Sequence, residues 1–141
     1  MSILCAVSGK VSPDNVVTVG HDLATTYDTE LAVLNVMTRD RFETLADERV
    51  EFYMDDGAAE AKQTARTVTR ETITEPHNFD PRGRVGDPTE EIIEEAARMD
   101  ATYIVIGGRK RTPVGKAVFG STTQSVLLNA EQPVVTVMSE E

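Results

Sequence analysis

The sequence has no tryptophan and a single cysteine, and only 5% of its residues are aromatic. One cysteine excludes an internal disulfide, and the place of Cys5 within an apolar run favours a small buried side chain over a reactive thiol. No stretch approaches the roughly 18 apolar residues that a membrane helix needs. The first residues lack the basic region of a signal peptide. We therefore expect a cytoplasmic protein with no membrane partner.

Lysine is also scarce, since only four of the 14 basic residues are lysines, whereas 24 residues are acidic. The formal net charge of −10 favours solubility and disfavours binding to nucleic acid. The same composition fits a protein adapted to high internal salt, where repulsion between carboxylates is screened. Composition alone leaves both interpretations open.

What the chain does contain is a regular alternation of apolar runs and helical patterns over its 141 residues. Continuous apolar runs are typical of strands covered on both faces, and apolar residues three or four apart predict helices. The predicted strands are Ile3–Val7, Leu31–Met37, an irregular one within Glu71–Val85, Thr102–Ile106 and Pro133–Met138. The predicted helices are Asn15–Tyr27, a long one within Thr38–Thr69 that Gly57 interrupts, one that starts near Pro88, and Ser121–Leu128.

This alternation predicts one α/β domain over residues 1–141, a doubly wound five-stranded parallel sheet in the order 3-2-1-4-5 with helices on both faces. In such folds ligands bind beyond the carboxyl ends of the strands, where the strand order reverses. The crevice is then expected between the first and fourth strands. The loops at that point are Ser8–Lys10 and Gly107–Phe119.

The second of these loops begins the most unusual segment of the chain, Gly107–Thr122, with four glycines, four basic residues and no carboxylate. It lies within an acid-free run from Ala101 to Ala130. Glycines allow a ligand to approach the backbone closely, and the free N–H groups at a helix start bind anions. Two interpretations stand: a phosphate site that uses Ser121 and Thr122, or a helix cap after a flexible loop.

Other motifs are absent or weak. Gly115-Lys116 is followed by alanine, so no Walker A loop is present, and the first strand lacks a dinucleotide fingerprint. The two histidines are not at ligand spacing, so no metal site is expected. The paired carboxylates Glu90-Glu91 and Glu94-Glu95 are expected on solvated helix faces.

The segment from Gly107 to Ser121 resembles the nucleotide-binding loop of the universal stress protein family, G-x2-G-x9-G-[ST]. Gly107 and Gly120-Ser121 match the two ends of the pattern, and Lys110 replaces the middle glycine. The flanking segments YIVIGG and STTQSVLLNAEQPVVTVM are similar to the family's fourth strand and to its last helix and strand. GDPTEEIIEEAARMDATYIVIGG is similar to the third-helix region. The likeness extends over nearly the whole chain and is strongest between Gly86 and Met138.

The resemblance implies that ATP or a related adenine nucleotide binds, with Mg²⁺ as a candidate companion ion, although the family also includes members that bind no ATP. In the binders, residues after the first strand contact the nucleotide, commonly including an Asp, and the end of the second strand contacts adenine. Ser8 stands at the Asp position and Val36 at the adenine-side position. The implied nucleotide-binding residues are Ala6, Val7, Ser8, Val36, Ile106, Gly107, Gly108, Lys110, Gly120, Ser121 and Thr122.

The function implied is a nucleotide-responsive module in stress response or regulation, whose protein partner the sequence does not identify. At most slow ATP hydrolysis is expected, because no general base can be named. The alternative is a dimeric interaction protein of the same fold that has lost nucleotide binding. A remote alternative is an ATP pyrophosphatase-type enzyme, since Ser8–Ser12 faintly resembles the S-G-G-x-D-S loop. The valine-rich Pro133–Met138 strand is expected to lie at the sheet edge and to pair two copies into a homodimer.

Overall fold

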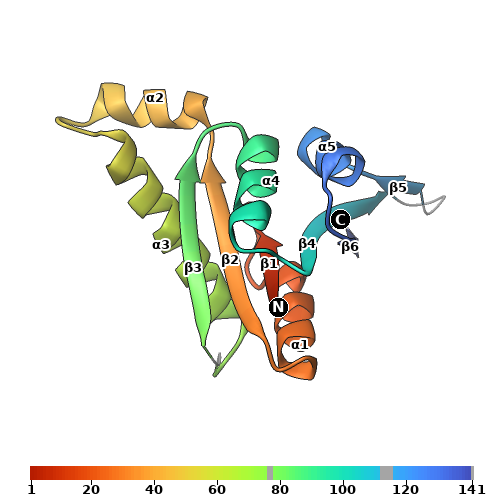
Figure 1. The fold of residues 1–141 in the computed structure, drawn as a ribbon. Coiled ribbons are helices and arrows are strands. Elements are labelled where there is room, and N and C mark those ends of the chain that lie inside the picture. Colours follow the sequence, from red (N-terminus) through yellow and green to blue (C-terminus); the bar gives the residue numbers. More distant parts are fainter. Residues whose placement is uncertain (76–77, 112–115, 141) are drawn as a thin grey trace.

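The first and second strands pair in parallel at the centre of the sheet, and the remaining strands add on either side of them (Figure 1). The computed structural model describes residues 1–75, 78–111 and 116–140. The described strands are β1 (Ser2–Ala6), β2 (Glu30–Met37), β3 (Phe79–Val85), β4 (Tyr103–Arg111), β5 (Lys116–Val118) and β6 (Val134–Glu140). The described helices are α1 (Asn15–Thr26), α2 (Arg39–Glu48), α3 (Met54–Thr72), α4 (Pro88–Arg98) and α5 (Ser121–Asn129).

The five predicted strands are present and parallel, in the spatial order β3-β2-β1-β4-β6, with β6 as the fifth strand of the prediction. This confirms the order 3-2-1-4-5. The pairing of β1 with β2 on one edge and β4 on the other means that the chain winds away from β1 in both directions. The carboxyl ends of β1 and β4 therefore mark the topological switch point.

Two apolar layers hold the helices onto the sheet. Alternate residues of each strand point to opposite faces. Side chains such as Ile3 and Val33 pack with α1 and α3 on one face. Leu4 and Ile104 pack with α4 and α5 on the other. Cys5 is buried on the first face, as expected, where burial and the Asp14 charge raise the pKa of its thiol.

The long helical region predicted over Thr38–Thr69 is two helices, and the predicted interruption at Gly57 is wrong. The chain leaves α2 at Arg49 and starts α3 after Tyr53, with Glu51 in the left-handed region at φ 55°. Gly57 lies inside α3, where a Cβ would come within 2.8 Å of a methyl group of Val85. Close helix–strand packing, rather than a break, accounts for this glycine.

The predicted loop after the fourth strand needs a second correction. β4 continues beyond Ile106 to Arg111, and Arg109–Arg111 then pair with the antiparallel strand β5. Figure 1 shows this extension curving away from β1 toward β5, which lies next to α5. Residues 112–115 lie outside the described residues. The predicted strand-to-helix loop is thus largely β-structure.

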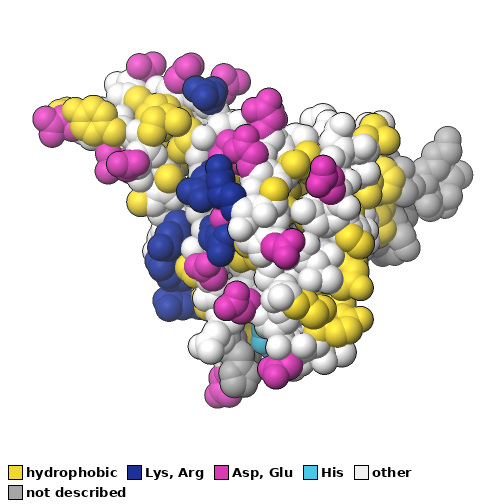
Figure 2. All heavy atoms as spheres, viewed as in Figure 1, with side chains coloured by type: hydrophobic (Ala, Val, Ile, Leu, Met, Phe, Trp, Pro, Cys, Tyr) yellow, Lys and Arg dark blue, Asp and Glu magenta, His cyan; other side chains and the backbone are white. Residues whose placement is uncertain are grey.

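Charged side chains are distributed unevenly over the surface. Figure 2 shows acidic side chains scattered over one face, whereas many of the basic ones gather beside β3 and α3. The described residues include no helix that is long and apolar enough to cross a membrane.

Candidate functional site

The candidate site is built at the carboxyl ends of β1, β2 and β4. Ala6 and Val7 are buried at the end of β1, and Ile106 is buried in β4. The Val7 N–H donates to the Leu34 carbonyl at 2.9 Å, which continues the pairing of β1 with β2 past the end of β1. Val36 is half-buried near the end of β2. The structure therefore brings these predicted residues together at the carboxyl ends of the strands.

The loop after β1 is held by contacts from β2 and α3. Gly9 has φ +78°, and a Cβ there would lie 2.5 Å from the Thr64 methyl, so both conformation and space require glycine. The buried side chain of Asn35 donates from Nδ2 to the Val7 carbonyl at 2.9 Å. Exposed Ser8 accepts a bond from the Lys10 N–H at 3.2 Å, so its hydroxyl is partly engaged within the loop.

Three helices begin with a side chain that occupies their first N–H groups. Asp14 accepts from Val16 at the start of α1, Thr38 accepts from Arg41 in α2, and Asp87 accepts from Glu90 in α4. Burial raises the pKa of the Asp14 carboxyl, and its hydrogen bond from the Val16 N–H opposes this rise. A carboxylate therefore already fills the anion position at α1.

The start of α5 is different, because its N-cap is Gly120 and no side chain caps it. The N–H groups of the first helical turn, which begins with Ser121 and Thr122, have no partner within the helix. Gly120 has φ −64°, and a Cβ placed on it would meet no atom within 4 Å. Neither backbone conformation nor packing requires this glycine. The space beside it is open to a ligand.

Thr123 fixes this helix start against the crevice. It is 7% exposed, and its hydroxyl donates to the Gly107 carbonyl at 2.8 Å. Gly107 itself lies close to α1, because a Cβ there would come within 3.3 Å of Val16. The uncapped start of α5 is thereby held beside β4.

Gly108, which follows Gly107 in β4, has a packing role. A Cβ on buried Gly108 would lie 2.8 Å from the Met138 sulfur and 3.1 Å from the Phe119 ring. Protein side chains thus fill the space that the sequence assigned to a ligand at this position. Lys110 lies within β4, in register with Ala117 of β5 and Glu140 of β6.

Three features of the site were not predicted from the sequence: Asn35, Thr123 and β5. Asn35 had a signal, since it is the one polar residue in the apolar run Leu31–Met37. Thr123 had no such signal in the sequence. Ser121, Thr122 and Thr123 are adjacent hydroxyl residues, and only the packing of α5 determines which of them bonds to β4. β5 is three residues long and offers no alternation from which to predict a strand.

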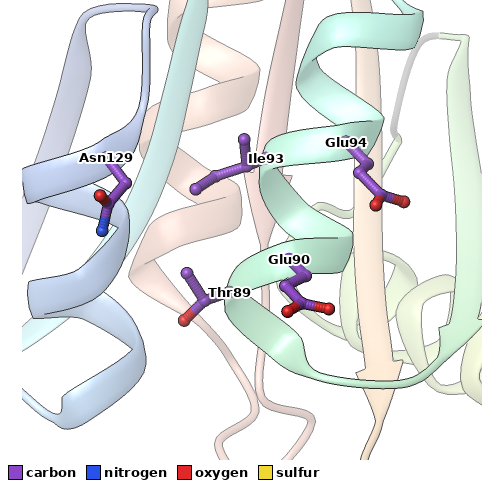
Figure 3. Close-up of a pocket in the computed structure, with 5 residues that line it drawn as sticks. All are labelled: Thr89, Glu90, Ile93, Glu94 and Asn129. Carbon is purple, nitrogen blue, oxygen red and sulfur yellow. The ribbon is translucent and has the colours of Figure 1, made fainter.

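A surface cavity lies elsewhere, between α4 and α5. Its volume is about 350 Å³, and it is lined by Thr89, Glu90, Ile93, Glu94 and Asn129. Figure 3 shows Thr89 and Ile93 on the side of α4 that faces α5, and the two carboxylates turned away from α5. This acidic lining does not suit a phosphate. Over the described ranges no group of His, Cys, Asp and Glu could hold a metal ion.

The fold, and the candidate site at the carboxyl ends of β1, β2 and β4, can be compared with known proteins. The model of the universal stress protein family matches residues 1–138. The chain belongs to this family. Over 60 residues it is 45% identical to a universal stress protein of Mycolicibacterium smegmatis (strain ATCC 700084 / mc(2)155), covering 42% of this chain and 46% of that protein. The chain spans less than half the length of the curated relatives it matches.

Solved structures of other universal stress proteins share the fold. The universal stress protein from Archaeoglobus fulgidus is 29% identical, with a TM-score of 0.64 over 96% of this chain and 97% of that one. A universal stress protein from the same organism in complex with dAMP is 23% identical, with a TM-score of 0.60 over 96% of both chains. The dAMP is bound by that protein, and the likeness at this identity shows the fold of this chain.

Proposed function

We propose that this universal stress protein binds an adenine nucleotide in the crevice between the ends of β1 and β4 and acts in stress response or regulation. The observation that carries the proposal is the uncapped start of α5, which lies beside an open Gly120 and is fastened to β4 by Thr123. It stands in a segment with no carboxylate in a chain of charge −10. A helix start of this kind favours a phosphate.

The proposed contacts lie at the carboxyl ends of β1, β2 and β4 and at the start of α5. The α-phosphate lies at Gly120–Thr122, and the sugar lies between Ser8 and Gly107. Val36 is proposed to contact the adenine through its backbone, with Ala6, Val7, Ile106 and Gly108 forming the floor. Ser8 replaces part of what a carboxylate would offer a ribose, since a hydroxyl both donates and accepts. The whole assembly is proposed as one cytoplasmic domain over residues 1–141 that forms a homodimer.

The dAMP-bound relative and membership of the family support this proposal. A second candidate is an interaction protein that has lost nucleotide binding. The observations that favour it are the Ser8 hydroxyl engaged by the Lys10 N–H and the space at Gly108 filled by Met138 and Phe119. Both features reduce what the site offers a ligand.

The deciding experiment is calorimetry with ATP and AMP, with and without Mg²⁺, on the wild type and on Gly120→Val. The valine places two methyl groups in the open space at the start of α5, so binding should fall at least about tenfold while the thermal midpoint changes little, because Gly120 has an ordinary φ. The matched control is Gln124→Val, which adds the same side chain at an exposed position of the same helix.

Nucleotide analysis of freshly purified, denatured protein provides an independent measurement. Retained adenine nucleotide would support the proposal. No heat with either nucleotide and no retained nucleotide, in low and high salt alike, would establish the interaction protein instead.

A further inference from the structure

We infer that the site recognises a nucleoside monophosphate, and that the β- and γ-phosphates of ATP gain no backbone hydrogen bonds from the chain. The inference rests on the proposed function and defines which part of the nucleotide the site holds. It follows from the strand pairing that replaces the expected loop after β4.

Both edges of β4 are occupied where a phosphate-binding loop would need free N–H groups. Arg109–Arg111 pair with Val118–Lys116 of β5 on one edge. On the opposite edge, Arg109 and Lys110 are in register with Ser139 and Glu140 of β6. The N–H groups of successive residues in a strand point alternately to its two edges, and strands lie on both edges here. The backbone donors of this segment are therefore committed to the sheet.

The position of β5 relative to the switch point explains why the pairing of these N–H groups matters for a ligand. Ile104 and Val105 pair with β1 on one edge and β6 on the other. Because β6 stays on its edge through Lys110, β5 must lie on the β1 edge, beyond the end of β1. β5 thus lies on the same edge of β4 as the switch point and pairs with the residues that follow it.

Past Gly108, within the part of the chain that the structure describes, the start of α5 offers backbone donors that no strand engages, and one helical turn suits one phosphate group. The remaining attraction for further phosphates is the positive charge of Arg109, Lys110, Arg111 and Lys116. Attraction between solvated charges is screened by salt, with a Debye length of about 3 Å at 1 M and about 30 Å at 0.01 M. Any advantage of ATP over AMP should therefore disappear in concentrated salt.

The test is calorimetry of the full chain with AMP and ATP in about 10 mM and about 1 M KCl. We expect ATP to bind more tightly than AMP in low salt and within about threefold of AMP in high salt. ATP binding at least about tenfold more tightly than AMP in high salt would overturn the inference and leave the proposed function standing. Absence of binding by both nucleotides at both salt concentrations would overturn the proposed function and this inference together.

A charge variant separates screened attraction from backbone recognition. Lys110→Ala should lower the ATP-to-AMP affinity ratio in low salt by about twofold to tenfold and leave the ratio in high salt unchanged. Lys62→Ala removes the same charge from an exposed position on α3 and should leave both ratios unchanged. An equal effect of the two variants would overturn the assignment of the attraction to the basic segment.

Amide resonances identify the donors directly. On titration with ATP in high salt, the N–H resonances of Ser121 and Thr122 should shift as they do with AMP. Those of Arg109–Arg111 should show no change specific to ATP. A shift at Arg109–Arg111 that only ATP produces would show that the pairing with β5 yields to the phosphates, and would overturn the inference.

Discussion

At the scale of single residues, the proposed site depends on the contrast between Gly120 and Thr123. Gly120 leaves an open space at the start of α5, and Thr123 holds that start in place through its bond to Gly107. Asn35 has a similar positioning role at the end of β1, where it bonds the Val7 carbonyl. The polar residues that shape the crevice are thus mostly engaged with the protein's own backbone.

Thr123→Val tests the positioning role, because valine keeps the shape of threonine and removes only the donor. The Gly107 carbonyl loses its partner, so the free energy of unfolding should fall by about 1–2 kcal/mol. Affinity for AMP should fall more than in Thr18→Val, a control at an exposed position of α1. Denaturant unfolding and calorimetry measure the two effects. Equal behaviour of the two variants would contradict a positioning role for Thr123.

At the scale of secondary-structure elements, a charge cluster joins the edge strand β3 to α4. Glu95 is 1% exposed, and its carboxylate accepts hydrogen bonds from Arg82 at 2.6 Å, Arg84 at 3.0 Å and Arg98 at 2.9 Å. The expectation that Glu95 lies on a solvated face was wrong. A buried carboxylate persists here because three guanidinium groups compensate for its lost hydration.

Glu95→Gln should lower the free energy of unfolding by roughly 2–4 kcal/mol, because three neighbouring cations lose their common anion. The control is Glu94→Gln, since exposed Glu94 bonds only Arg98, at 3.3 Å, and an exposed pair contributes about 0–1 kcal/mol. Urea unfolding of both variants measures the difference. Equal losses would mean that burial of the cluster adds nothing to its stability.

The same cluster predicts part of the acid sensitivity. Burial acts to raise the pKa of Glu95, but the hydrogen bonds from the three arginines outweigh it and hold the pKa below the ordinary value for glutamate. The folded state then binds fewer protons than the unfolded state at this site. Its stabilisation is complete above the ordinary pKa and is lost as pH falls through the lowered one. The stability difference between wild type and Glu95→Gln should therefore shrink through this range, and a difference independent of pH would contradict the assignment.

At the scale of the whole molecule, the charge of −10 predicts that salt stabilises the fold. Carboxylates spread over the surface repel one another, and counter-ions screen that repulsion. The thermal midpoint should rise steadily from low to molar KCl. A flat or falling midpoint would remove the salt-adapted interpretation and leave an ordinary acidic surface.

The open edge of β6 predicts the oligomeric state. β6 pairs with β4 on one edge, and no other described strand pairs with it. The Ile104 N–H donates to the Pro133 carbonyl, so by alternation the N–H of Thr136 faces the open edge. Thr136→Pro removes this donor and should give monomers, whereas Thr136→Val keeps the donor and should stay dimeric. Light scattering at micromolar concentration measures both, and a monomeric wild type would refute the dimer.

The sequence was sufficient to predict those strands and helices whose formation depends on residues close together in the chain. The apolar runs at Ile3–Val7 and Leu31–Met37 form strands because they can be buried on both faces, and Pro88 marks a helix start in sequence and structure alike. The alternation of these elements determined the fold class and led to the prediction of a site at the switch point. The resemblance in Gly107–Ser121 identified the family.

Tertiary structure alone decided the features that depend on residues distant in sequence. Glu95 is buried beside three arginines, and two of them, Arg82 and Arg84, come from β3, where no pattern within α4 shows them. β4 extends to Arg111 because β5 and β6 pair with its two edges. Pairing of this kind has no local signature, since each ladder joins segments whose spacing along the chain is arbitrary. The sequence therefore predicted where a ligand would bind, and the long-range pairing decided which backbone groups of β4 are engaged in the sheet.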